Sequence, residues 1–371
     1  MIIGFPKEIR ATEGRFAITP EGVSLLSNNN NKILIEKSAG ESVGYSDEDY
    51  EKAGAKIIDS AEEIFSDAEM IVKILPLMPS EIKYLKKGQI IFSFMHLASD
   101  KSLTEALIQK KITAIAYEQI KTESGRYSVL FPISEIAGKM SVQIAASLLA
   151  DKDNGSGILL GGIVGVPSAK VLIIGAGTVG INAAKIAAGM GADVRIADID
   201  IDKLRNVDKL LGSQVKTYIS TQSILKELIK DSDVVIGAVH YHKYRYIVSE
   251  EMVKSMKKGS VIVDVSIDEG GIVETEDRIT TLDNPTYTKY GVIHYCVPNI
   301  ASSVARTATL ALTNETLKYI LDIANYNVTN AIKRDSSLYK GVNIFNGHLT
   351  NKHIARIHSL EYDELSSLIG F

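Results

Sequence analysis

The fold of this chain is decided by the stretch Val171-Leu172-Ile173-Ile174-Gly175-Ala176-Gly177-Thr178-Val179-Gly180, an apolar run that leads directly into a glycine-rich turn. Residues 181–190 continue the stretch with a helical pattern. In a strand–turn–helix unit, Gly175 permits the tight turn, Gly177 lets backbone amides approach a pyrophosphate, and Gly180 allows close packing of helix on strand. The stretch therefore predicts a dinucleotide-binding unit.

An acidic residue follows this turn at the distance that such a unit requires. The next predicted strand, Asp193–Asp198, ends in a carboxylate about 20 residues after the glycines, where it can accept hydrogen bonds from both ribose hydroxyls. The same charge repels a 2′-phosphate. We therefore expect NAD rather than NADP as the cofactor. The alternative is a glycine-rich turn in an ordinary α/β core.

Strand-like and helix-like segments alternate outward from this unit in both directions. We predict strands in the second half at 170–174, 193–198, 214–219, 233–239, 260–266 and 291–297, and in the first half at 32–36, 68–75, 89–95 and 113–118. Helices are expected at 133–150 and 306–326. The fold class is therefore α/β, with a doubly wound sheet in the second half.

Local signals mark two helix starts and one interruption. Ser46 and Asp49 have the spacing of a capping box, and Pro20 after Thr19 suits the first position of a helix. Residues 151–157 are a cluster of glycine and polar residues, which is either a linker or a surface loop.

Composition and charge exclude several classes of protein. The 371 residues suffice for about two domains, and 45% hydrophobic with 23% charged residues is typical of a folded chain. A net charge of -4 without a local basic patch argues against nucleic-acid binding. The single cysteine, Cys296, excludes an intramolecular disulfide, and the start at Met1 has no secretory signal. No apolar run is long enough for a membrane helix, so we expect a cytoplasmic protein.

Several blocks of sequence resemble the alanine dehydrogenase and transhydrogenase family, in order and over essentially the whole chain. They are Ile3-Gly4-Phe5-Pro6-Lys7-Glu8, Gly14 to Pro20, Met95-His96-Leu97-Ala98, Ser134 to Ser141, Leu160-Gly161-Gly162, Val263 to Gly271, His294 to Val297, Ala311 to Asn314 and Lys340 to Leu349. Among these, His96 and Asp268 resemble the dehydrogenases more than the transhydrogenases.

The resemblance implies two doubly wound Rossmann-like domains and an activity. Residues 1–128 plus 307–371 would form a substrate domain, split in sequence by an NAD-binding domain at 129–306, with catalysis in the cleft between them. The implied reaction is the NAD-dependent oxidative deamination of a small L-amino acid, L-alanine to pyruvate and ammonia, with reductive amination as its reverse. A homo-oligomer, commonly a hexamer, is implied as well.

The resemblance also assigns roles to individual residues. Arg15 would grip the substrate carboxylate through its planar fork. His96, at the end of an apolar strand, would exchange a proton with the substrate near neutral pH. Asp268, after the fifth strand of the NAD domain, would orient the attacking water and stabilise cationic intermediates. Each has a structural alternative: a solvated loop arginine, a structural histidine and a turn-capping aspartate.

By the same family pattern a further set of residues would contact the cofactor. These are Ser134, Gly175, Gly177, Thr178, Val179, Gly180, Asp198, Lys203, Ser220, Val239 and Asn299.

The sequence departs from the family pattern at the position of a lysine that polarises the keto oxygen. The register reads Lys73-Ile74-Leu75-Pro76, which puts Leu75 at the family's lysine position. Alternate residues of a strand point to the same face, so Lys73 is a candidate substitute. It is equally a structural lysine whose stem crosses a buried strand.

Two further departures lie near the expected nicotinamide pocket. Residues 240–245 read His240-Tyr241-His242-Lys243-Tyr244-Arg245, where the family has an apolar loop with proline and glycine. The two histidines lack a cysteine or acidic cluster at zinc-like spacing, so no metal is expected. The other departure is Pro298-Asn299-Ile300-Ala301-Ser302, where many relatives have Ala-Asn-Met-Pro.

These departures leave two other functions open. The altered loop at 240–245 is compatible with an imine reductase or an opine-type enzyme that joins a keto acid to an amine. The missing lysine is compatible with a non-catalytic NAD-binding protein.

Overall fold

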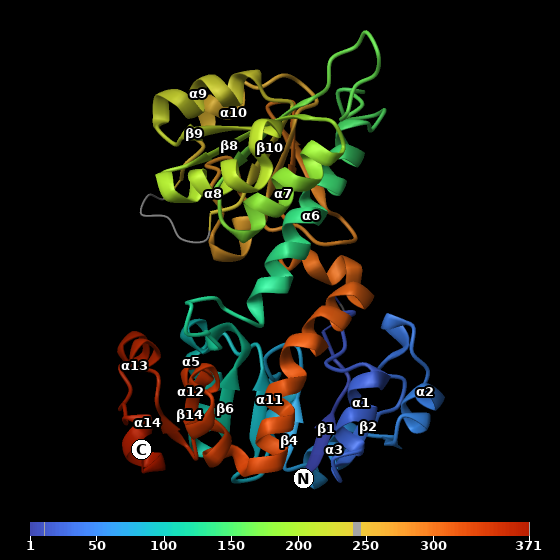
Figure 1. Cartoon of the computed structure of the whole chain (residues 1–371), viewed down its shortest axis with the longest axis vertical. Coiled ribbons are helices and arrows are strands. Elements are labelled where there is room, and N and C mark those ends of the chain that lie inside the picture. The colour runs from blue at the N-terminus through green and yellow to red at the C-terminus, as the bar shows by residue number, and fades with distance from the viewer. Residues whose placement is uncertain (11, 240–245, 371) are drawn as a thin grey trace. The chain divides into compact units, whose positions relative to one another are not determined.

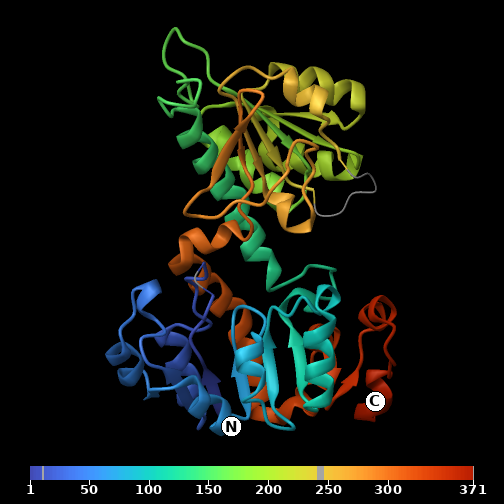
Figure 2. The same ribbon diagram turned by 180° about the vertical axis from the view of Figure 1, so that it is seen from behind.

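The chain forms two compact units, of which the second interrupts the first in sequence. The computed structural model describes residues 1–10, 12–239 and 246–370. Unit 1 comprises Met1–Ile133 and Val304–Phe371, and unit 2 comprises Ser134–Ser303. The breaks therefore fall at 133/134 and 303/304, where the sequence suggested 128/129 and 306/307. Figures 1 and 2 show the whole chain from two sides.

The sheet of unit 1 has eight strands in the order β15-β14-β6-β5-β4-β1-β2-β3. The first six strands of the chain are parallel and follow the doubly wound order 3-2-1-4-5-6, to which β14 and β15 are added antiparallel. Their bounds are β1 Ile2–Phe5, β2 Lys32–Glu36, β3 Ala55–Ile58, β4 Met70–Val72, β5 Ile90–Ser93, β6 Thr113–Ala116, β14 Val342–Phe345 and β15 His348–Leu349.

Apolar residues cover both faces of this sheet. On β4, Met70 and Val72 belong to one core and Ile71 to the other, as the alternation of strand side chains requires. The long helix α11 covers the first face, and α3 and α5 cover the second. The helices of unit 1 are α1 Pro20–Ser27, α2 Asp47–Lys52, α3 Ala61–Asp67, α4 Pro79–Ile82, α5 Lys101–Gln109, α11 Ala305–Arg334, α12 Ser336–Gly341, α13 Lys352–His358 and α14 Leu365–Ile369.

The sheet of unit 2 has seven strands in the order β12-β13-β11-β10-β7-β8-β9. Six are parallel in the order 3-2-1-4-5-6, and β12 is an antiparallel edge strand. Their bounds are β7 Lys170–Ile174, β8 Asp193–Asp198, β9 Val215–Ile219, β10 Val234–Gly237, β11 Val261–Asp264, β12 Thr286–Lys289 and β13 Val292–Tyr295.

Unit 2 is also covered on both faces. Val171 and Ile173 of β7 face one core, and Leu172 and Ile174 face the other. Helices α6 Leu130–Leu149, α7 Thr178–Gly189 and α8 Ile201–Leu211 pack in the first core. Helices α9 Gln222–Asp231 and α10 Glu250–Lys254 pack in the second. The prediction of an α/β fold with two doubly wound domains is confirmed.

The local signals are confirmed where the structure shows them. Ser46 and Asp49 form the capping box of α2, and Thr19 accepts from the N–H of Gly22 with Pro20 in the first turn of α1. The cluster at 151–157 lies between α6 and β7 inside unit 2, so it is a loop and not a linker between the units.

Other predictions were incomplete. No strand was predicted at β1, β3, β12, β14 or β15. β3 and β12 carry polar residues and are only partly buried, and β14 pairs with β6, which is distant in the sequence. The helix predicted to end at residue 326 continues to Arg334, across a kink at Asn327 (φ 62°). No helix in the described part of the chain is long and apolar enough to span a membrane.

Candidate active site

The glycine turn of unit 2 has the backbone geometry that the motif requires. Gly175 has a φ of 108°, and a Cβ on it would collide with the carbonyl of Ala238, the residue after β10. A Cβ on Gly180 would collide with the carbonyl of Gly175. These two glycines let α7 begin directly against β7, at the point where the strand order reverses and doubly wound sheets bind ligands.

The space above Gly177 is open. A Cβ on this residue would meet no atom within 4 Å, although both neighbouring glycines of the motif are tightly packed. Gly177 is the N-cap residue of α7, and because it has no side chain it cannot cap the helix. No side chain accepts a hydrogen bond from the first N–H groups of α7, which begins at Thr178. Such a helix N-terminus suits a phosphate group, because N–H dipoles and the helix dipole both favour an anion there.

Asp198 ends β8 beside this turn. Its Oδ2 accepts from the N–H of Ala176 (2.7 Å) and its Oδ1 from the N–H of Asp200 (2.9 Å). The side chain is only 7% exposed, and the ammonium of Lys203 lies 3.8 Å from Oδ2. Because an ionised carboxylate has about four acceptor positions, both oxygens can accept further hydrogen bonds. Ser220 is joined to this corner through its N–H, which donates to the carbonyl of Asp198 (2.9 Å).

Asp268 lies in a short turn that follows β11, η5 (Val265–Glu269). The N–H of Asn299 donates to its Oδ2 (3.1 Å), so the structure brings two predicted site residues together. Asn299 itself has a φ of 54°, a left-handed conformation that asparagine tolerates well. In the same turn, Ser266 Oγ accepts from the N–H of Val239 (3.0 Å). Val239 follows β10 and lies against Gly175, where a Cβ would be 3.2 Å from its Cγ2.

The unit 2 residues therefore fit a nicotinamide dinucleotide. The open Gly177, the uncapped start of α7 and the carboxylate of Asp198 are grouped at the carboxyl edge of one sheet. Ser134 is half-buried in α6. The loop at 240–245, with His240 and His242, lies outside the described residues.

Arg15 of unit 1 is buried and holds a carboxylate. Its Nε donates to Glu13 Oε1 (2.7 Å) and one of its Nη atoms donates to Glu13 Oε2 (2.5 Å). Both side chains are at most 2% exposed. A guanidinium has five N–H donors, so Arg15 can bind a second carboxylate while Glu13 orients it. The buried position contradicts the alternative of a solvated loop arginine.

Lys73 follows β4 and is enclosed by two acidic groups. Its ammonium is 2.6 Å from Glu81 Oε1 and 3.4 Å from Glu8 Oε2, and its side chain is 1% exposed. Glu8 also accepts from the N–H of Ile74 (2.6 Å). Burial raises the pKa of Glu8, and the charge of Lys73 opposes that shift. Lys73 is thus the counter-ion of a buried acidic pair at the carboxyl edge of the sheet.

His96 lies at the same edge, beyond β5, and its side chain is exposed. The residue has a φ of 48°, and its N–H donates to Glu118 Oε1 (2.7 Å). Glu118, just after β6, also accepts from the N–H of Met95 (3.1 Å). The imidazole stacks on Phe94 with 6.1 Å between ring centroids and borders a hollow of about 260 Å³.

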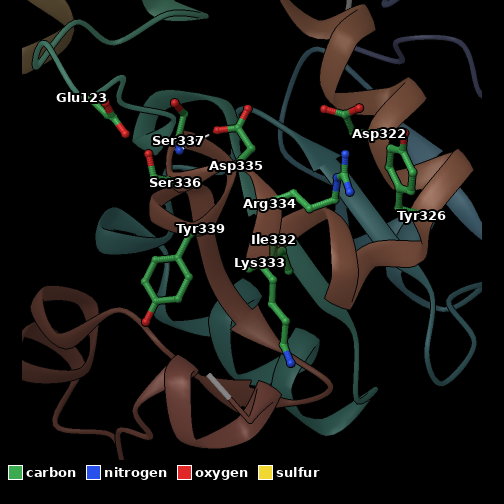
Figure 3. A pocket seen from close by; sticks show the side chains of 10 residues that line it. All are labelled: Glu123, Asp322, Tyr326, Ile332, Lys333, Arg334, Asp335, Ser336, Ser337 and Tyr339. Atoms are coloured by element: carbon green, nitrogen blue, oxygen red, sulfur yellow. Dashed lines mark hydrogen bonds between the residues drawn. The ribbon is translucent and has the colours of Figure 1, made fainter.

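A larger hollow of unit 1, about 780 Å³, lies elsewhere, around the end of α11 and the start of α12 (Figure 3). It is lined by charged and polar groups, among them Arg334, which stacks on Tyr326 with 4.1 Å to the ring centroid. None of the predicted site residues lines it. In the described part of the chain, no cluster of three or more His, Cys, Asp or Glu side chains is arranged to hold a metal.

The sequence prediction missed the residues that hold the predicted ones in place. Glu13, Glu81 and Glu118 were not singled out, although each contacts Arg15, Lys73 or the backbone of His96. For Glu118 a signal was present, since it ends the predicted strand 113–118 at the edge where His96 was placed. Glu13 and Glu81 lie in loop or helix segments whose pairing depends on the folded chain.

The comparisons with known proteins cover the whole chain. Family models for the alanine dehydrogenase/PNT N-terminal and C-terminal domains match residues 4–137 and 141–352. The alanine dehydrogenase of Methanococcus maripaludis is 49% identical over 98% of this chain and 98% of that protein. That of Bacillus subtilis is 48% identical over 98% and 96%. The solved structure of an L-alanine dehydrogenase, 39% identical, superposes with a TM-score of 0.93 over 97% of this chain and 99% of that one.

The two family models and the full-length relatives therefore show that the chain belongs to the alanine dehydrogenase/PNT family.

Proposed function

We propose that this protein is an NAD-dependent amino-acid dehydrogenase that converts L-alanine and water to pyruvate and ammonia, and catalyses the reverse reductive amination. The observation that carries the proposal is full-length similarity to proteins named alanine dehydrogenase, at 44 to 49% identity. The intact glycine turn and the carboxylate of Asp198 support the choice of cofactor. By family resemblance we also propose a cytoplasmic homo-oligomer, a hexamer.

Arg15, His96 and Asp268 each receive one task. Arg15, oriented by Glu13, binds the substrate carboxylate. His96 takes a proton from the substrate nitrogen or oxygen and returns it, and Asp268 orients the water that attacks the imine carbon. The bound nicotinamide ring supplies the hydride chemistry. Ser134, Thr178, Val179, Lys203, Ser220, Val239 and Asn299 are proposed to line the cofactor together with the three glycines and Asp198.

Asp198 should make the protein prefer NAD to NADP. A 2′-phosphate would bring at least one negative charge against a carboxylate that is 7% exposed, although Lys203 partly offsets this repulsion. We expect NADH to bind at least about tenfold more tightly than NADPH. Fluorescence titration with the two reduced cofactors measures the ratio of their dissociation constants. Equal dissociation constants would show that Asp198 does not select NADH over NADPH. The Asp198→Asn variant should bind NADH and NADPH with more similar affinities than the unaltered protein does.

We propose Lys73 as the lysine that serves the substrate in place of the missing one at position 75, and Lys73→Met tests this. The substitution should lower kcat by about 10² or more if Lys73 acts on the substrate. It should also destabilise the fold, because Glu8 and Glu81 lose their buried counter-ion, at a cost of about 3 to 5 kcal/mol. Turnover is therefore measured on protein shown to be folded by circular dichroism. If the folded Lys73→Met variant keeps an unchanged kcat, Lys73 serves only as the counter-ion of Glu8 and Glu81.

The presence of Leu75 in place of a family lysine makes the substrate the point to test first. NADH formation at alkaline pH is measured with each common L-amino acid. Activity with L-alanine above the others supports the proposal. Activity only with a keto acid and an amine together, in the direction of NADH oxidation, would indicate an opine-type reductase. NADH binding without turnover on any substrate would indicate a non-catalytic protein.

A further inference from the structure

A second pair of carboxyl groups is buried under the turn that carries Asp268. Asp264 ends β11 and is 1% exposed, and Glu276 lies further along the chain with its Oε2 buried. A Cβ on Gly271 would lie 2.5 Å from Glu276 Oε2 and 3.2 Å from Asp264 Oδ2, so both oxygens face the same glycine. The two carboxyl groups are therefore close neighbours.

Both oxygens of Asp264 accept backbone hydrogen bonds, and each has room for a further donor. Its Oδ1 accepts from the N–H of Ser266 (2.8 Å), and its Oδ2 accepts from the N–H of Ile272 (2.6 Å). These bonds pin both ends of the segment 265–272, which includes Asp268. Through Ser266 the same carboxylate is connected to Val239, whose N–H donates to Ser266 Oγ. The position of two predicted site residues thus depends on Asp264.

The other groups that face Glu276, within the described residues, supply no positive charge. Glu276 Oε1 accepts from the thiol of Cys296 (3.4 Å), which follows β13 and in turn lies 3.7 Å from the hydroxyl of Tyr287 on β12. Lys289 of β12 is engaged with the exposed Asp277 and with the carbonyl of Thr275. Glu276 Oε2 has no hydrogen-bond donor from these neighbours.

Two adjacent buried carboxylates without a cation cannot both be ionised at moderate cost, so one proton must be shared between them. Asp264 accepts two backbone N–H bonds, which favour its charged form, and the proton therefore resides on Glu276. We propose that Glu276 is a positioning residue for the Asp268 turn: its protonated carboxyl donates from Oε2 to Asp264 and holds residues 265–272 in the conformation that catalysis uses. The proposal rests on the proposed role of Asp268.

The electrostatic environment supports this assignment. Burial, followed by the charge of Asp264, raises the pKa of Glu276 from the ordinary 4.5 to about 10. Glu276 therefore takes up a proton on folding across this range of pH. Its contribution to the free energy of unfolding is complete below pH 4.5, declines as the pH rises, and is lost above about 10.

Glu276→Gln is the informative substitution, because its amide donates to Asp264 at every pH and has nearly the same shape. Melting temperatures of the variant and of the unaltered protein are measured from pH 6 to pH 9.5. The difference between them (variant minus unaltered protein) should increase by more than about 5 °C from the lowest to the highest pH. Because the two proteins share every other titrating group, the pH dependence of the difference in melting temperature reports on Glu276 alone. Parallel melting curves across this range would overturn the proposal.

Activity provides a readout that a merely structural role would not move. With L-alanine at pH 7, Glu276→Gln should keep kcat within about twofold, and Glu276→Ala, which removes the donor, should lose at least about tenfold. At higher pH the unaltered protein should lose kcat and Glu276→Gln should not. Equal kcat in all three proteins at every pH would contradict the positioning role proposed for Glu276. If no protein of the set oxidises any amino acid, the proposed function fails, while the melting series still decides whether Glu276 carries the proton.

Discussion

Replacement of His96 by asparagine is expected to lower kcat for L-alanine by about 10²- to 10⁴-fold, the usual contribution of a general acid–base group. Asparagine tolerates the left-handed backbone at this position (φ 48°) and retains the N–H that donates to Glu118. It has no nitrogen that takes up a proton near neutral pH. Since the His96 side chain is exposed, the melting temperature should stay within about 1 °C.

A matched control is available in the same unit. His348 is also exposed and pairs with Asp363 through Nδ1 (2.9 Å), outside the proposed machinery. His348→Asn should therefore leave kcat unchanged. Steady-state rates of NADH formation across pH 6 to 10 measure both variants. If His96→Asn retains full kcat, proton transfer at this position is excluded, and Arg15 and Asp268 would have to act without it.

Replacement of Gly177 by alanine is expected to weaken NADH binding by about 10- to 100-fold without loss of stability. The added methyl group meets no protein atom within 4 Å and the residue has an ordinary φ of -80°, so the folded chain accepts it. It would occupy the space through which a pyrophosphate approaches the backbone amides of the turn. One charge-assisted hydrogen bond lost corresponds to about 1.5 to 3 kcal/mol, which gives the expected range of affinity.

Gly189, near the end of the same helix, is the control for this substitution. A Cβ there also meets no atom within 4 Å, and the residue is exposed. Gly189→Ala should leave NADH affinity unchanged and stabilise the helix slightly, since alanine is the better helix former. Titration of intrinsic cofactor fluorescence separates the two variants. Equal affinity in Gly177→Ala and Gly189→Ala would contradict a pyrophosphate site at this turn.

The prediction of the fold succeeded where a signal lies within a few consecutive residues. The strand before Gly175, the helix after it and the acid at Asp198 are all local signals. The structure has the strand and the acid at the predicted positions, and the helix, predicted from residue 181, begins at Thr178. β7, β10 and β11 of unit 2 were visible because a strand buried on both faces is almost entirely apolar. β12, with the pattern Thr-Tyr-Thr-Lys at the sheet edge, carries no such run, and its pairing with β13 is a contact made only by the folded chain.

In the predicted site, too, local motifs were recognised and contacts between distant segments were missed. Arg15, His96 and Asp268 were found from motifs, but their charge partners were not. Glu13 is two residues from Arg15, yet nothing in the sequence distinguishes an ion pair from two solvated side chains at that spacing. Glu118 reaches the backbone of His96 from 22 residues away because β5 and β6 are adjacent in the sheet.

What the sequence determined by itself was the kind of unit, its cofactor class and the family, because strand–glycine–helix signals act over short distances along the chain. Only the tertiary structure decided which titratable groups are buried together: Lys73 with Glu8 and Glu81, and Glu276 with Asp264. Burial removes the water that otherwise screens each charge, so the ionisation of such groups depends on neighbours that are distant in the sequence.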